Sequence, residues 1–108
     1  MNTFKFDPYS PPNGLIYHYY ASGAVYRIQR FENGQKVGLQ EAFYEDGSPK
    51  TIEPYKEGFR NGLTLLYWPN GRLKRSVSFS QGVRHGEDCL WNEAGVLTFK
   101  AVYENGHI

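Results

Sequence analysis

The sequence is poor in the residues that cross-link a small domain or carry it into a membrane. Cys89 is the one cysteine among 108 residues, so no intramolecular disulfide can form, and we expect a reducing compartment. No apolar run approaches the ~20 residues that a membrane-spanning helix needs. Residues 1–13 contain no apolar core of a secretory signal. Together these absences predict a cytoplasmic protein.

A strong charge bias and a helical period are also missing. The 12 Lys and Arg residues nearly balance the 11 Asp and Glu residues, and the formal net charge is +1. So small an excess creates no overall attraction to nucleic acid, and we expect no nucleic-acid partner. No segment repeats its apolar residues with the period of a helix. The aromatic content of 17% instead favours strands, because flat rings pack well on a pleated sheet.

Motifs that mark catalysis or cofactor binding are absent as well. His18, His85 and His107 stand at three unrelated places, and with Cys89 they lack the close ligand spacing of a structural zinc site. The glycines form neither a dinucleotide-binding pattern nor a P-loop, and no nucleophile elbow or distinct acid–base pair occurs. The sequence therefore predicts no enzyme activity, no cofactor, no metal and no catalytic residue. Cys89 is expected to be a packed thiol.

The glycines reveal what the chain does contain, a repeat of 24 residues. All 12 of them fall into three series with this spacing. The series are Gly14, Gly38, Gly62 and Gly86; Gly23, Gly47, Gly71 and Gly95; and Gly34, Gly58, Gly82 and Gly106. Such a repeat indicates a stack of similar units that bury their faces against one another. It divides the chain into an N-terminal extension, 1–13, and four units, 14–37, 38–61, 62–85 and 86–108.

Each unit has the pattern of one β-hairpin. Six residues, rich in apolar and aromatic side chains in the first three units, follow the first glycine, and a turn such as Asp46-Gly47 or Asn70-Gly71 comes next. These dipeptides are strong hairpin signals because glycine accepts the positive φ of such turns. A longer return strand and a second glycine turn complete the unit, and the second return strand is expected to be bent or poorly paired at Pro49 and Pro54. The sequence predicts an all-β fold, an elongated single-layer antiparallel meander of four 24-residue β-hairpin repeats with about eight strands.

Aromatic residues recur at fixed places in the units. Two series carry a ring in every unit: Tyr19, Phe43, Tyr67 and Trp91, and Phe31, Tyr55, Phe79 and Tyr103. Since equivalent positions of stacked units are neighbours, we expect two continuous ladders of rings that pack as a core. The next position holds Tyr20, Tyr44 and Trp68, which should point to the opposite face because adjacent strand residues alternate. An exposed row of rings is a candidate binding surface; coverage by the N-terminal extension or by the sheet's own curl is the equal alternative.

The N-terminal extension, 1–13, lies outside the repeat. Pro8, Pro11 and Pro12 disfavour both a helix and regular strand pairing. Phe4, Phe6 and Tyr9 could lay rings on the first unit, and the terminal unit of a stack needs a cap. We therefore expect a capping segment, with a flexible arm that contacts a partner as the alternative.

The net charge alternates in sign along the units. The first and third units are positive, and the second and fourth are negative. Ion pairs across neighbouring strands are the favoured explanation, since they would fix the stacking order at a few tenths of a kcal/mol each. Alternatively, Arg72, Lys74 and Arg75 form a basic patch for an acidic partner or a phosphate headgroup.

The pattern aromatic-x-x-Gly-x-x-x-Gly resembles the MORN repeat. Phe31-Glu-Asn-Gly34-Gln-Lys-Val-Gly38 shows it, and it returns at residues 55–62 and 79–86. With the following Leu-Tyr-Trp-Pro-Asn-Gly-Arg-Leu-Lys, residues 66–74, the third unit is more similar to the bacterial MORN-variant repeats of YwqK-type antitoxin-like proteins. The resemblance covers residues 14–106 and implies a MORN-like architecture.

The resemblance also implies a non-catalytic protein-binding repeat protein. The bacterial variants are often antitoxins or immunity proteins, so the leading hypothesis is a protein that neutralises a cognate toxin by occluding its active surface. The expected partner-binding residues are Tyr20, Tyr44, Trp68, Arg72, Lys74 and Arg75. The alternative is a scaffold that self-associates through the C-terminal edge strand or docks on anionic lipid. Ring cages for quaternary ammonium ligands, as in choline-binding repeats, are a third hypothesis, disfavoured by the missing secretory signal.

Overall fold

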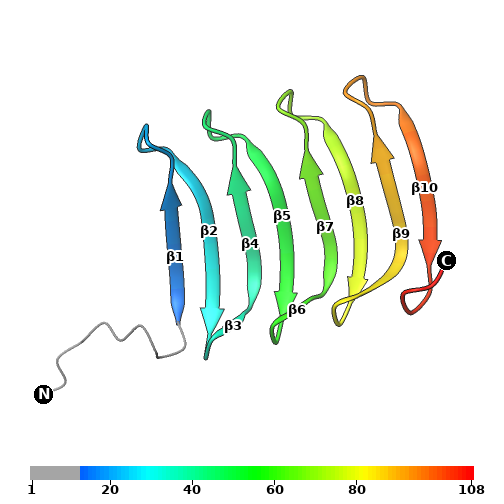
Figure 1. Cartoon of the computed structure of the whole chain (residues 1–108), viewed down its shortest axis with the longest axis horizontal. Helices are drawn as coiled ribbons and strands as arrows, with labels where there is room; N and C mark the ends of the chain where they lie inside the picture. Colours follow the sequence, from blue (N-terminus) through cyan, green and yellow to red (C-terminus); the bar gives the residue numbers. More distant parts are fainter. Residues whose placement is uncertain (1–12) are drawn as a thin grey trace, which may run out of the picture.

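A computed structural model describes residues 13–108, which form one antiparallel β-sheet (Figure 1). Its strands are β1 (Gly14–Tyr19), β2 (Val25–Glu32), β3 (Gln35–Lys36), β4 (Gly38–Phe43), β5 (Pro49–Lys56), β6 (Phe59–Arg60), β7 (Gly62–Tyr67), β8 (Leu73–Ser80), β9 (Val83–Trp91) and β10 (Leu97–Tyr103). The long strands lie side by side in chain order, β1-β2-β4-β5-β7-β8-β9-β10. The all-β meander predicted from the glycine repeat is confirmed.

The sheet contains two short strands that the sequence did not predict. β3 pairs with β2, and β6 pairs with β5, each over two residues. In these places the chain turns back along the strand it has just left before it enters the next unit. In the third unit the equivalent residues, Val83 and Arg84, run without a break into β9. The count is therefore ten strands where about eight were expected.

Every hairpin has the same register, which the 24-residue repeat requires. The first glycine of each unit pairs with the aromatic residue that ends the return strand, as Gly14 does with Phe31 and Gly62 with Phe79. β5 follows this register with the same length as β2 and β8, so the expected distortion at Pro49 and Pro54 is wrong. β5 pairs with β7 only at Thr51 and Ile52, so neither proline has to donate a backbone hydrogen bond to β7.

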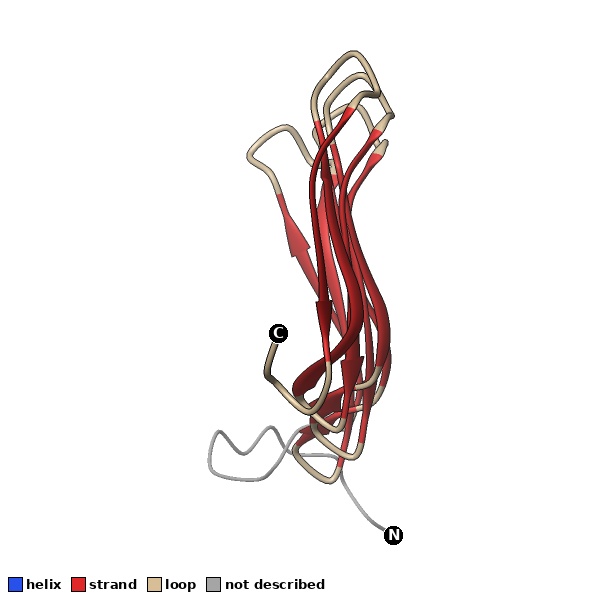
Figure 2. Ribbon diagram, turned by 90° about the vertical axis from the view of Figure 1, so that its right-hand side faces the viewer, coloured by secondary structure: helices blue, strands red, loops and turns tan. Residues whose placement is uncertain are grey.

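In the described residues the sheet is one bowed layer without a second layer to cover it, as the side view shows (Figure 2). Its extents are 57 × 37 × 16 Å, and its radius of gyration of 16.6 Å exceeds the about 13 Å of a compact domain of similar length. This part of the chain lacks the large hydrophobic core of a globular domain. Among residues 13–108, the buried hydrophobic side chains are Val77, 4% exposed, and Cys89, 7% exposed. The prediction of a packed thiol at Cys89 is thus confirmed.

Cations separate the rings at the ends of the return strands. The Arg60 guanidinium lies 5.8 Å from the ring centre of Tyr55 and 5.5 Å from that of Phe79. Lys36 covers the other side of Tyr55 at 5.1 Å. The predicted ladder of ring on ring is wrong here, because equivalent residues of successive units lie two strands, about 9.6 Å, apart. Rings stack at about 4.5–7 Å, so a flat cation fills the space between them.

Hydrogen bonds at the second turns tie each unit to the one before it. The amides of Gly58, Gly82 and Gly106 donate to the carbonyls of Lys36, Arg60 and Arg84 at 3.0, 2.7 and 2.8 Å. Asn13 makes a similar link at the start of the sheet, where its side-chain oxygen accepts from the amide of Asn33 at 2.7 Å. The rest of the predicted cap, residues 1–12, lies outside the described part of the chain.

Gly62 and Gly14 provide a test of how tightly the units pack. Both occupy the first position of their unit with a positive φ, 107° and 89°. A Cβ at Gly62 would lie 3.2 Å from Cγ of Pro54, whereas one at Gly14 would meet no atom within 4 Å. Gly14→Ala should lower the free energy of unfolding by about 1 kcal/mol through backbone strain alone. Gly62→Ala should cost more, as measured by urea denaturation; equal losses would contradict the importance of the Pro54 contact.

Candidate interaction surfaces

The predicted ring row Tyr20, Tyr44 and Trp68 connects neighbouring units. The hydroxyl of Tyr20 donates to the carbonyl of Phe43 at 2.6 Å, and that of Tyr44 donates to the carbonyl of Tyr67 at 2.7 Å. The indole N–H of Trp68 donates to the carbonyl of Trp91 at 3.1 Å. All three side chains are half-buried. Each ring therefore bridges its own hairpin turn to a strand end in the next unit.

The ring row ends in the fourth unit, where Asn92 takes the position. Its side-chain oxygen accepts from the amides of Ala94 and Val96, both at 3.0 Å, within its own turn. Because the short side chain of Asn92 is hydrogen-bonded within its own turn, it does not extend toward a further unit. The last unit thus lacks the bridging donor that the other three carry.

The predicted basic residues have separate partners inside the protein. Arg72 donates from its guanidinium to the carbonyl of Ala94, across the neighbouring turn. The Lys74 ammonium lies 4.6 Å from the ring centre of Trp68. Arg75 donates to both carboxylate oxygens of Asp88, at 3.0 and 2.7 Å. These three cations do not gather around one ligand position, and their contact with a partner stays a prediction, as does that of the ring row.

The pair Arg75–Asp88 joins a positive unit to a negative one. Asp88 is 1% exposed, so its carboxylate depends on Arg75 for compensation. Donating hydrogen bonds to this carboxylate raises the pKa of Arg75 above its ordinary value, which keeps the guanidinium charged. Arg30 and Glu41 form a second link of this kind, 2.8 Å apart, between the first two units. Ion pairing across strands, the favoured explanation of the alternating charge, is confirmed at these two positions.

One side of the sheet carries a continuous apolar surface, which the sequence reasoning missed. Alternation along the first strand of each unit and cross-strand pairing to its return strand place these side chains on one side. This apolar face comprises Leu15, Tyr17, Tyr19, Val25, Ile28, Leu39, Phe43, Ile52, Leu63, Leu65, Tyr67, Leu73, Trp91, Leu97 and Val102. Leu63 is 52% exposed and Tyr19 62%. The expectation that the Tyr19 series packs as a core is therefore wrong for Tyr19, since a single layer has no interior on this side.

Four charged side chains within the apolar face form two ion pairs. By the same register, Arg30, Glu41, Glu87 and Lys100 point to this side. Arg30 pairs with Glu41 at 2.8 Å, and Lys100 pairs with Glu87 at 3.1 Å. The face thus presents rings and aliphatic side chains with no excess of either charge. In the sequence, the alternation of Leu15, Tyr17 and Tyr19 along the first strand indicated this apolar face. The aromatic series, which contain one position from each unit, did not show it.

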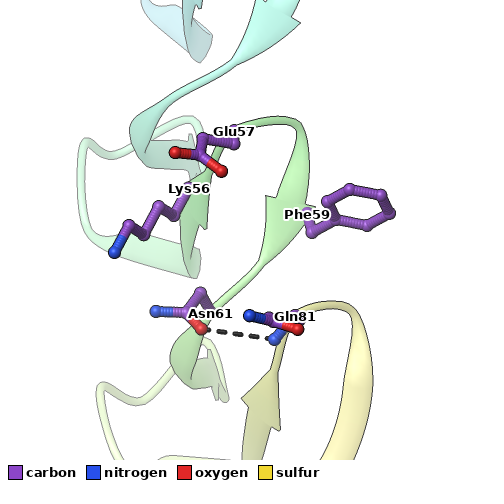
Figure 3. A pocket seen from close by; sticks show the side chains of 5 residues that line it. All are labelled: Lys56, Glu57, Phe59, Asn61 and Gln81. Atoms are coloured by element: carbon purple, nitrogen blue, oxygen red, sulfur yellow. Dashed lines mark hydrogen bonds between the residues drawn. The ribbon is translucent and has the colours of Figure 1, made fainter.

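An open notch lies between two units near the second turns (Figure 3). Phe59 lies on one side and is exposed, and the side-chain oxygen of Asn61 accepts from the amide of Gln81 at 3.2 Å. Lys56 and Glu57 line the rest of the notch. No group of three potential metal ligands occurs in residues 13–108. The same residues contain no helix long and apolar enough to cross a membrane.

The repeat can also be recognised by comparison with known proteins. Residues 36–57 match the family model described as a MORN repeat variant. The chain is a MORN-repeat-like protein. No curated protein matches it. The repeat indicates a protein-binding or membrane-associated module, of a kind that is in general non-catalytic. The matched segment covers the turn before β4 and the hairpin of β4 and β5, so the family pattern lies on the same structural unit that builds both faces.

The ring row of this MORN-repeat-like protein should contribute measurably to its stability. Tyr44→Phe removes only the hydroxyl that donates to the carbonyl of Tyr67. We expect the free energy of unfolding to fall by about 1 kcal/mol, the net value of such a bond. Tyr19→Phe is the matched control, because its hydroxyl is exposed and has no hydrogen-bond partner in the described residues. Urea denaturation measures the free energy of unfolding of both variants. Equal values for Tyr44→Phe and Tyr19→Phe would refute the bridging role of Tyr44.

The Arg75–Asp88 pair should matter more than an exposed pair. Arg75→Gln leaves a buried carboxylate without its cation and should cost about 3 kcal/mol of unfolding free energy. Lys100→Gln breaks the exposed pair with Glu87 and should cost less than about 1 kcal/mol. Both variants change the net charge equally, and thermal and urea unfolding would separate them. A loss below 1 kcal/mol for Arg75→Gln would show that the pair does not hold the third and fourth units together.

Proposed function

We propose that this MORN-repeat-like protein is a non-catalytic protein-binding module whose apolar face docks a partner protein. The exposed apolar face carries this proposal. An apolar side of a sheet is ordinarily buried against another layer. Here no second layer covers it in residues 13–108, and exposed apolar surfaces of this size mark interaction sites. The partner supplies the missing layer.

The composition of the apolar face suits a protein partner better than a lipid surface. Anionic membranes attract an excess of Lys and Arg. On this face Arg30 and Lys100 are each paired with a carboxylate, so that excess is absent. Tyr and Trp, which dominate binding energy at protein interfaces, are plentiful instead. With extents of 57 × 37 Å, the sheet offers more than the about 800 Å² that each partner contributes to a standard interface.

Continuation of the sheet by a second copy is less well supported. A copy added at the outer edge of β10 would lie where Asn92 offers no bridging donor. A partner of different sequence on the apolar face does not require such a donor. A protein partner is therefore favoured over a self-associating scaffold.

We further propose that the partner is a cognate toxin, which the protein neutralises by covering its active surface. The resemblance of residues 66–74 to repeats of bacterial antitoxin-like proteins supports this identity. A bacterial cytoplasm is the compartment in which such an inhibitor acts. The role needs a rigid surface and no catalytic group, and the bridging rings Tyr20, Tyr44 and Trp68 supply that rigidity.

The decisive experiment is co-expression with the product of the neighbouring gene. We expect a stoichiometric complex and rescue of growth. Leu63→Glu places an unpaired charge on the apolar face and should weaken the complex at least 100-fold, since burying an uncompensated carboxylate is costly. Phe99→Glu is the matched control, because Phe99 is similarly exposed but lies on the opposite side of the sheet. Absence of a complex, or equal binding by Leu63→Glu and the wild type, would refute the docking surface.

A further inference from the structure

A groove crosses the side of the sheet opposite the apolar face. Two adjacent hollows form it, and they share Thr51 and Glu53. We call it the central groove, lined among others by Arg27, Lys36, Thr51, Thr64, Phe79 and Arg84. The larger hollow has a volume of about 260 Å³ and lies over β5, β7 and β8. The groove is thus wide enough for side chains of another molecule.

The central groove carries an excess of positive charge. Arg60 pairs with Glu53 at 2.9 Å, and Arg75 pairs with Asp88. In the described part of the chain, the three further cations Arg27, Lys36 and Arg84 have no carboxylate within ion-pair distance. The whole protein has a formal net charge of only +1. The excess is therefore a property of this groove and not of the surface as a whole.

Aromatic rings hold the three unpaired cations in place. The Arg27 guanidinium lies 5.6 Å from the ring centre of Tyr26, and the Lys36 ammonium lies 5.1 Å from that of Tyr55. Arg84 lies 5.2 Å from the ring centre of Tyr103 and also donates to its hydroxyl at 3.0 Å. Such contacts restrict the long side chains without neutralising them. A ligand that meets these cations finds them already positioned.

The central groove also contains polar atoms that lack partners. Two buried side-chain atoms of residues 13–108 have no hydrogen bond, Oγ1 of Thr64 and Nε of Arg27, and both residues line the groove. Thr64 is 7% exposed. Buried polar atoms are nearly always satisfied in folded proteins, and exceptions call for an explanation. A bound acceptor that enters the groove with a small adjustment of these side chains would satisfy both.

We propose that the central groove binds acidic side chains from an extended segment of a protein. The carboxylates accept hydrogen bonds from Arg84 and Arg27, and the Thr64 hydroxyl donates to a carboxylate in the larger hollow. The methylene groups of a glutamate pack against Val77 and Phe79, which line the same hollow. A free phosphate would leave these apolar walls uncovered, so the geometry favours a glutamate-containing peptide.

This site goes beyond the proposed function because it lies on the other side of the sheet and uses charge instead of apolar contact. A toxin on the apolar face and an acidic segment in the central groove are independent. Leu63→Glu should therefore leave binding in the groove unchanged, and Arg84→Gln should leave the toxin complex intact. Failure of one proposal does not imply failure of the other.

The test is fluorescence anisotropy of fluorescein-labelled hexaglutamate titrated with the full chain at low salt. We expect saturable binding that weakens as salt is added, because the contacts are charge-assisted. Arg84→Gln and Arg27→Gln should each weaken binding about tenfold, the loss of about 1.4 kcal/mol expected for a hydrogen bond to a charged group. Thr64→Val should weaken it several-fold without lowering the melting temperature, since it removes an unpartnered hydroxyl and keeps the shape of the side chain.

Lys56→Gln is the control for net charge, because Lys56 is exposed at the notch and outside the groove. It should bind hexaglutamate like the wild type, and melting curves confirm that each variant is folded. An equal loss in Lys56→Gln and Arg84→Gln would overturn the site in favour of diffuse charge attraction. No binding of hexaglutamate would overturn it as well, as would groove-dependent binding to phosphatidylserine vesicles in the absence of peptide binding.

Discussion

Equivalent residues of successive units lie two strands apart, about 9.6 Å, and this spacing determines how the units hold together. Two rings at that separation do not touch, so the chain fills or bridges the gap in other ways. A guanidinium lies between Tyr55 and Phe79. Hydroxyl and indole groups reach across to backbone carbonyls at the hairpin turns. The sheet therefore depends on polar links between neighbours where a globular domain would depend on its core.

This way of holding the units together separates the two sides of the sheet. The bridging groups and their cations use the side that carries the central groove, where Gln40, Thr64 and Asp88 are the buried polar residues of β4, β7 and β9. The other side carries the ion pair between Arg30 and Glu41 and is otherwise mostly apolar. A single layer can thus present two surfaces of opposite character, one suited to an apolar partner and one to acidic side chains. Repeat proteins without a core are free to do this because their stability is spread over the links between units.

The first and last units show how such a stack ends. The last unit replaces the bridging ring with Asn92, which satisfies its own turn. Where the third unit passes into the fourth, the residues equivalent to β3 and β6 run without a break into β9. The first unit receives its second-turn link from Asn13. The fourth unit therefore offers, at its outer side, no donor equivalent to the ring row.

Much of the fold could be predicted from the sequence because backbone geometry is local. The glycine series marks positions with positive φ, such as Gly62 at 107°, and their spacing sets both the hairpin length and the register. The partners of charged and polar groups were harder to predict. Arg72, Lys74 and Arg75 are close in sequence, yet they contact Ala94, Trp68 and Asp88 separately. Only the packing of one unit on the next determines these contacts.

The sequence by itself determined the repeat, the all-β class and the order of the strands, since each follows from residues within one 24-residue unit and its neighbour. Only the tertiary structure decided which side of the sheet is exposed and which backbone carbonyls accept hydrogen bonds from the ring row. Alternation divides side chains between two sides but does not say which side another layer covers. It likewise cannot show that Tyr44 bridges to Tyr67, because that hydrogen bond depends on the distance between units.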